Sequence, residues 1–268
     1  MQIIFFLIIF AFGLFIGSFL NCVIYRLEQG KSFLKGRSYC PHCKHQLFWQ
    51  DLIPVLSFFI LRGKCRYCQK SISWQYPLVE LATGIIFILC FLLAPYQALL
   101  WCGVSCFLLI IFVYDLKHFI IPDKVIFPAI IIVVFYRVFE FLSLNHWNLI
   151  ENWSLKIENL GHLVNPLLAA LGASVFFLII FLVSRSRWIG LGDAKLGFFM
   201  GLFLGFPNIL VALFLSFFIG AIIGIGLILA KKKNLKSEVP FGPFLITGTI
   251  IDLFLGEKLI DWYLNLII

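Results

Sequence analysis

Four acidic residues lie near the ends of long apolar segments, where a charge is costly and usually serves a function. They are Glu80, Asp115, Asp123 and Asp193. Asp115 ends one apolar segment, Asp123 opens the next, and Asp193 begins a later one. Two carboxylates that share a site cannot both ionise easily, so one holds a proton while the other polarises a water molecule. The chemistry predicted for such a pair is hydrolysis of a peptide at a membrane surface.

The residues around Asp193 fit this hypothesis, but they also fit a simpler one. Gly190 and Gly192 precede Asp193, and Lys195 follows it. Glycines let helices approach closely and leave room for a peptide backbone. In the simpler interpretation, Asp193 only caps the helix that it begins, and Asp115 pairs with Lys117 or Lys195. A lone G-x-G-D tetrapeptide does not decide between the two.

Four of the eight cysteines form two short pairs, Cys40 with Cys43 and Cys65 with Cys68. Each C-x-x-C turn can present two thiolates to one side of a metal ion, and the interval between the pairs is typical of a zinc ribbon. Zinc suits four thiolates with no open coordination position, so the predicted site is structural. The alternatives are two disulfides, which a reducing cytoplasm disfavours, or four unrelated thiols.

The elements that must position these residues are helices in lipid. Of the 268 residues, 62% are hydrophobic and 13% are charged. A soluble domain of this length cannot bury so much apolar surface, and the long unbroken apolar runs exclude a transmembrane β-barrel. The sequence predicts an all-α polytopic membrane protein with about eight transmembrane helices. Their expected positions are residues 3–25, 77–95, 97–115, 119–139, 163–184, 189–206, 208–230 and 240–262.

Two polar stretches interrupt the apolar series, a basic loop over 26–76 and a loop rich in Asn, Trp and Glu over 140–162. The predicted domains are a first transmembrane helix over 1–25, the cysteine loop over 26–76 and a seven-helix membrane domain over 77–268. Alternating spans place 18 of the 21 Lys and Arg residues, Lys231–Lys233 included, on the side of the cysteine loop. The positive-inside rule assigns that side to the cytoplasm, with the N-terminus outside. The net charge of +8 then indicates orientation rather than a nucleic-acid partner.

Several strings, in order along nearly the whole chain, resemble those of the type IV prepilin peptidases. These strings are Gly17–Leu27 (GSFLNCVIYRL), Leu52–Ser57, Arg62–Cys65, Tyr76–Glu80, Asp115 with Pro122 and Asp123, Gly190–Asp193, and Pro240–Pro243. The resemblance implies an aspartic endopeptidase of the bacterial inner membrane. By the same resemblance, Asp115 and Asp193 are its catalytic pair, and Asp123 is a supporting residue.

The resemblance also implies substrates and a second activity. Type IV prepilins and type II secretion pseudopilins would be cleaved on the cytoplasmic side, after the last glycine of a basic leader. Many family members then N-methylate the new first residue with S-adenosylmethionine, and Gly63 and Lys64 match the region linked to methylation. From its sign and depth, we expect Glu80 either to meet basic residues of the leader or to be an interfacial charge. No strand followed by G-x-G-x-x-G occurs, so a Rossmann-type cofactor site is not expected.

Two other functions stay open from the sequence. One is a peptidase without methylation. The other is a proton-coupled transporter whose intramembrane carboxylates relay protons. A transporter should show inverted repeats and helices broken near the midplane, whereas the carboxylates here cluster at one face.

Overall fold

The computed structural model describes all residues except 1, 33–35, 148–152, 186–188, 231–238 and 268, so the predicted anchor Lys231–Lys233 lies outside the described residues. The elements are α1 (Gln2–Glu28), η1 (Trp49–Leu52), α2 (Leu56–Ile60), α3 (Gln75–Leu93), α4 (Ala98–His118), α5 (Asp123–Trp147), α6 (Trp153–Ser184), α7 (Leu191–Leu204), α8 (Asn208–Leu229) and α9 (Gly242–Ile267). Within the described ranges there are no strands, only two isolated β-bridges. The predicted all-α fold is confirmed.

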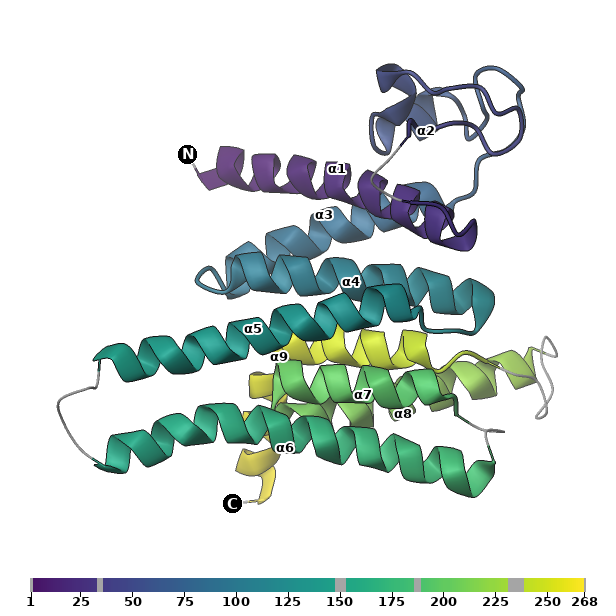
Figure 1. Cartoon of the computed structure of the whole chain (residues 1–268). Coiled ribbons are helices and arrows are strands. Elements are labelled where there is room, and N and C mark those ends of the chain that lie inside the picture. The colour runs from purple at the N-terminus through teal and green to yellow at the C-terminus, as the bar shows by residue number, and fades with distance from the viewer. Residues whose placement is uncertain (1, 33–35, 148–152, 186–188, 231–238, 268) are drawn as a thin grey trace. The chain divides into compact units, whose positions relative to one another are not determined.

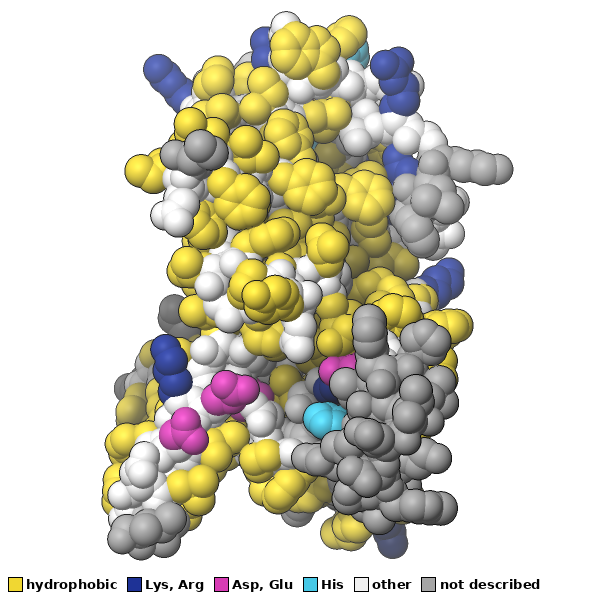
Figure 2. Space-filling model, turned by 90° about the vertical axis from the view of Figure 1, so that its left-hand side faces the viewer, with side chains coloured by type: hydrophobic (Ala, Val, Ile, Leu, Met, Phe, Trp, Pro, Cys, Tyr) yellow, Lys and Arg dark blue, Asp and Glu magenta, His cyan; other side chains and the backbone are white. Residues whose placement is uncertain are grey.

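Six helices of the described chain are long and apolar enough to cross a membrane: α1, α3, α4, α5, α6 and α8. The face in Figure 2 is covered mostly by hydrophobic side chains. Helices α7 and α9 also lie at predicted segments. However, α7 has only 14 residues, about 21 Å of helix against roughly 30 Å of hydrocarbon, and α9 carries Asp252, Glu257 and Lys258. The class of polytopic helical membrane protein is therefore confirmed, with six clear spans and two less regular helices.

The polar stretch 140–162 is largely helical, so the prediction of a loop there was wrong. Helix α5 continues to Trp147, and α6 begins at Trp153. Residues 140–160 contain neither glycine nor proline, so the sequence has no strong helix breaker that would stop either helix.

The chain divides into two compact units, residues 1–110 and 111–268. In the first unit, α1 lies along α3 (Figure 1). Their backbones touch at glycines: an added Cβ would lie 2.7 Å from Gly84 Cα at Gly13, and 2.6 Å from Glu80 Cα at Gly17. Small residues allow this approach, in which dispersion contacts and interhelical hydrogen bonds replace the hydrophobic effect.

In the second unit, α7 is the helix that the others surround. It packs most extensively on α6 and also contacts α5, α8 and α9, while α8 packs along α9. Glycine again sets the closest contact, because a Cβ on Gly201 would lie 2.5 Å from backbone atoms of Ala169 and Ala170. The position of α7 therefore depends on the absence of a side chain at Gly201.

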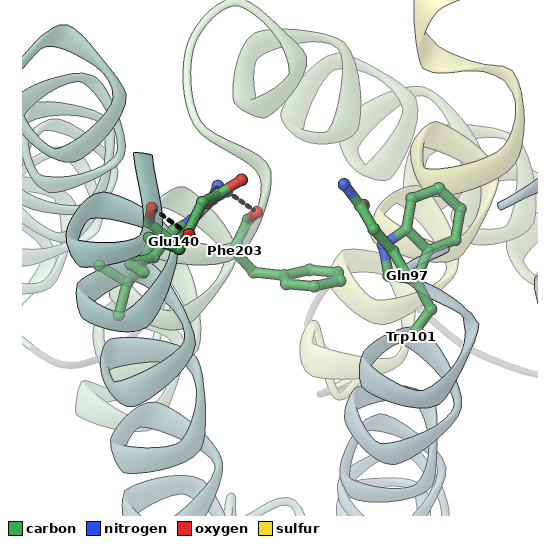
Figure 3. A network of polar contacts seen from close by, with 7 residues as sticks. Gln97, Trp101, Glu140 and Phe203 are labelled. Atoms are coloured by element: carbon green, nitrogen blue, oxygen red, sulfur yellow. Dashed lines mark hydrogen bonds and ion pairs between the residues drawn. The ribbon is translucent and has the colours of Figure 1, made fainter. Parts of the chain in front are cut away.

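The C-terminal end of α7 is held by side chains from two neighbouring helices. Arg137 of α5 donates to the Phe203 carbonyl at 2.6 Å and pairs with Glu140 at 3.0 Å (Figure 3). Asn165 of α6 donates to the Phe206 carbonyl at 2.9 Å and accepts from the Phe206 amide at 2.7 Å. A helix that ends inside the membrane needs such partners, because its last carbonyl groups have no hydrogen-bond donor within the helix.

Replacement of Gly201 tests the packing of α6 on α7. We expect Gly201→Ala to lower the free energy of unfolding by about 1–3 kcal/mol, because the methyl group must displace backbone. The matched control is Gly172→Ala on α6, where an added Cβ meets no atom within 4 Å. Thermal unfolding in detergent would measure both variants. An unchanged melting temperature for Gly201→Ala would contradict the packing.

Candidate active site

Asp193 lies in the first turn of α7 and is buried, with 8% of its surface exposed. The Gly190 amide donates to Asp193 Oδ2 at 3.1 Å. This is a capping interaction, as the simpler sequence interpretation expected. It also fixes the carboxylate at the positive end of the helix, where a negative charge is stabilised.

Asp115 lies in the last turn of α4 and is buried as well. Its carboxylate accepts a hydrogen bond from the backbone amide of Gly242, the first residue of α9. The approach requires glycine, because a Cβ on Gly242 would lie 2.5 Å from Asp115 Oδ2. Like Asp193, Asp115 therefore faces the N-terminal end of a helix.

The two carboxylates belong to one site within the second unit. A Cβ atom added at Gly192 would lie 3.3 Å from Ile121 Cδ1, and one added at Gly242 would lie 3.6 Å from the same atom. The glycines beside Asp193 and Asp115 thus contact one side chain, and the charge of Asp115 acts on Asp193. Two buried carboxylates that interact in this way can share one proton.

Asp123 stands outside this pair. Its Oδ1 is 2.6 Å from Lys195 Nζ, and its side chain is 58% exposed. Lys195 also lies over the ring of Phe127, 5.4 Å from the centroid. The predicted alternative in which Asp115 pairs with Lys195 is therefore not observed. Exposed pairs contribute little stability, but this one joins the first turn of α5 to the first turn of α7.

The four cysteines of the loop come together as their spacing predicts. The sulfur atoms of Cys40, Cys43, Cys65 and Cys68 all lie within 4.8 Å of one another, and those of Cys40 and Cys68 are 3.9 Å apart. Four ligands at 2.3 Å around a tetrahedral ion are about 3.8 Å from each other. The cluster could therefore hold a metal ion.

The two halves of the cluster are built alike. The Cys40 amide donates to the His45 carbonyl, and the Cys65 amide donates to the Lys70 carbonyl, both at 2.9 Å. Burial opposes ionisation of Cys40, but amides of the first turn and neighbouring thiols outweigh it and lower the pKa of Cys40 to about 7. A thiol that ionises readily suits a metal ligand.

The string Gly17–Leu27 had no assigned role, and the structure shows what it does. Asn21 on α1 donates to the Tyr76 carbonyl at 3.0 Å, at the start of α3. Arg26 is buried and donates to the carbonyls of Ser32 and Gly36 at 3.3 and 2.8 Å. Polar residues inside an apolar helix were the signal for such contacts. They fix the first residues of the cysteine loop to α1.

Glu80 is buried in α3 and already has partners within the protein. The Val55 amide donates to Glu80 Oε2 at 2.8 Å, and the Ser18 side chain also bonds to this carboxylate. Glu80 therefore ties the residue before α2 to a membrane helix. Its predicted contact with a substrate leader stays a prediction.

Gly63 and Lys64 lie in the turn that follows α2. Gly63 has a φ of +68° and donates to the Phe58 carbonyl at 2.8 Å, and Lys64 forms a β-bridge with Ser71. A glycine is favoured in this left-handed conformation. Their predicted link to methylation stays a prediction.

A buried carboxylate pair at two helix N-termini, on a helical membrane scaffold, is the arrangement that a membrane aspartic peptidase requires. Residues 11–94 match the bacterial peptidase A24 N-terminal domain, and residues 102–225 match the type IV leader peptidase family. The chain is 31% identical to the prepilin leader peptidase/N-methyltransferase of Aeromonas hydrophila, over 97% of this chain and 94% of the relative. The chain belongs to the type IV leader peptidase family.

Other relatives with the same name are equally complete matches. The protein of Legionella pneumophila is 31% identical over 97% of this chain and 94% of its own length. That of Bacillus subtilis is 28% identical over 97% of this chain and 98% of its own length. No solved structure matches the chain. Membership of a peptidase family does not favour the transporter alternative.

Replacement of Gly242 tests the contact that fixes Asp115. We expect Gly242→Ala to reduce peptidase activity about 100-fold. The added methyl group would displace Asp115, which the family resemblance implies to be catalytic, and a displacement of an ångström at such a group has an effect of that size. Gly224→Ala on α8 is the control, since its Cβ meets no atom within 4 Å. Hydrolysis rates of the two purified variants decide the matter, and full activity of Gly242→Ala would contradict the role of this glycine.

Proposed function

We propose that this protein removes the leader peptide from type IV prepilins and type II secretion pseudopilins, and then N-methylates the new terminal residue. The observation that carries the proposal is the buried pair Asp115 and Asp193, each held at the N-terminal end of a helix. Its nearly full-length relatives are named prepilin leader peptidase/N-methyltransferase, which supports the choice of substrate and the second activity.

Asp115 and Asp193 act as the acid and the base of the hydrolysis. The ionised carboxylate takes a proton from a water molecule, whose oxygen attacks the scissile carbonyl carbon. The protonated carboxyl donates to the carbonyl oxygen. The tetrahedral intermediate then collapses as the carboxyl that took the proton from water gives it to the nitrogen of the leaving chain. The other carboxylate recovers its proton from the hydroxyl of the intermediate, which becomes the carbonyl of the new terminal carboxyl group. The helix N-termini of α7 and α9 stabilise the negative charge that the pair carries throughout.

The cytoplasmic face is the side on which the cleavage takes place. The exposed pair Asp123 and Lys195 joins the start of α5 to the end of α7 that carries Asp193. A pair of exposed charges at this end is expected to face water rather than acyl chains. The bias of Lys and Arg residues supports a cytoplasmic position. Gly190 and Gly192 act as supporting residues. The Gly190 amide donates to Asp193, and Gly192 lets the first turn of α7 approach Ile121.

The cysteine cluster binds zinc in a structural role. Four sulfur ligands fill a tetrahedral site and leave no open position for a substrate. Zinc would hold the two similar halves of the loop together. A loop with so few buried apolar side chains gains most from such a constraint.

S-adenosylmethionine is the proposed methyl donor, and the described residues show no Rossmann-type site for it. No strand of the described chain leads into a glycine-rich turn, and Gly63 is occupied with the turn after α2. Methylation therefore rests on the names of the relatives and on the resemblance of the chain to the family.

Replacement of each aspartate tests the catalytic pair. We expect Asp115→Asn and Asp193→Asn each to reduce leader cleavage at least about 100-fold, because an amide cannot act as acid or base. Asp261→Asn, at an exposed position near the end of α9, is the isosteric control. The assay is the mass of a pilin subunit after incubation with the protein in lipid.

The same masses separate the two activities. With S-adenosylmethionine present, the cleaved subunit should gain the mass of one methylene group. Cleavage without this gain would support a peptidase that lacks methylation. Normal cleavage by either asparagine variant would overturn the assignment of the pair.

Metal analysis tests the zinc site. We expect one zinc ion per purified chain and its loss in Cys40→Ser, because three thiolates and a hydroxyl bind zinc far more weakly. Cys22→Ser on α1, outside the cluster, should keep the ion. Protein purified under reducing conditions without bound zinc would refute the site.

A further inference from the structure

The cysteine loop presents an apolar face that nothing in its own unit covers. Leu56, Phe59 and Ile60 of α2 are 61%, 56% and 73% exposed. Their spacing of three and four residues puts them on one side of the helix. Phe58 points the other way and is buried, with its ring centroid 4.9 Å from that of Trp74. Helix α2 is thus a single amphipathic turn.

The position of α2 relative to α3 is fixed within the first unit. The Val55 amide, just before α2, is bonded to Glu80, which is the sixth residue of α3. Five residues of helix correspond to about 7.5 Å along the axis of α3. Because α3 is a membrane-spanning candidate, this point lies just inside its end. In a bilayer that α3 spans, the start of α2 would therefore lie near the boundary between headgroups and acyl chains.

The residues beside the apolar face of α2 are of the types found at a membrane interface, a tryptophan and two cations. Trp74, directly before α3, is 62% exposed, and its ring is 6.5 Å from that of Phe59. Tryptophan is enriched at this level of the bilayer. Arg62 and Lys64 follow α2 in the sequence and are exposed. Apolar side chains beside cations are the pattern that binds anionic lipid surfaces.

We propose that α2 is an interfacial membrane anchor, in which Leu56, Phe59, Ile60 and Trp74 lie among the lipids. Arg62 and Lys64, which follow α2, then contact anionic lipid headgroups at the edge of this apolar face. The anchor holds the four-cysteine loop against the bilayer independently of any substrate. Lipid is favoured over a pilin segment as the occupant, because Phe59 lies beside Trp74, which directly precedes the membrane helix α3, and because the face is bordered by the cations Arg62 and Lys64.

Photo-crosslinking tests the anchor with the full-length protein in vesicles of phosphatidylcholine and phosphatidylglycerol. Phe59 or Ile60 is replaced by p-benzoyl-phenylalanine, and Lys70, an exposed residue of the same loop, serves as the control position. We expect lipid adducts in several-fold higher yield at positions 59 and 60 than at position 70, with no pilin present. In phosphatidylglycerol vesicles, Arg62→Gln with Lys64→Gln should lower that yield.

A second measurement does not depend on the crosslinker. Phe59→Trp adds one tryptophan, whose extra emission should be quenched by lipids brominated near the glycerol end of the acyl chains. Adducts that form only with the chain itself or with an added prepilin would overturn the proposal. So would an unquenched tryptophan at position 59.

Discussion

A helix that is too short to cross the bilayer must have both of its ends satisfied by protein. Helix α7 is such a helix, and much of the second unit follows from this constraint. Its C-terminal end is bonded to Arg137 and Asn165, from the helices on either side. Its N-terminal end carries Asp193, which bonds to the Gly190 amide. The cap that completes the helix is thus also one half of the carboxylate pair.

Close approach of backbones is the second condition for the site. Gly201 lets α7 lie directly on α6, and Gly242 lets α9 begin against Asp115. Neither contact leaves room for a side chain, so the geometry of the carboxylate pair depends on glycine at these two positions. In lipid this is an efficient way to hold helices, since apolar side chains gain little by leaving the acyl chains for each other.

The features that could be predicted from the sequence are those encoded locally. Hydropathy revealed the membrane helices, and the C-x-x-C spacing revealed the cluster of Cys40 with its partners. The bond between Asp115 and Gly242 could not be predicted, because these residues are far apart in the chain and meet only through helix packing. Arg137 was expected only to lie on the outer side. Its contact with Phe203 depends on where α7 ends, which a hydropathy pattern does not give. The loop predicted over 140–162 was wrong, because polar composition alone does not stop a helix and residues 140–160 contain neither glycine nor proline.

The order of the cysteines along the chain bears on how the protein enters the membrane. All four precede α3, so the cluster is complete before that helix leaves the ribosome. Domains fold progressively during synthesis, starting from the N-terminus. If this loop closed around a metal ion at that stage, it would form a compact body that resists threading through a translocation channel. It would lock the direction of α1 and α3 before the remaining helices are inserted, so that a structural ion would also act as a determinant of topology.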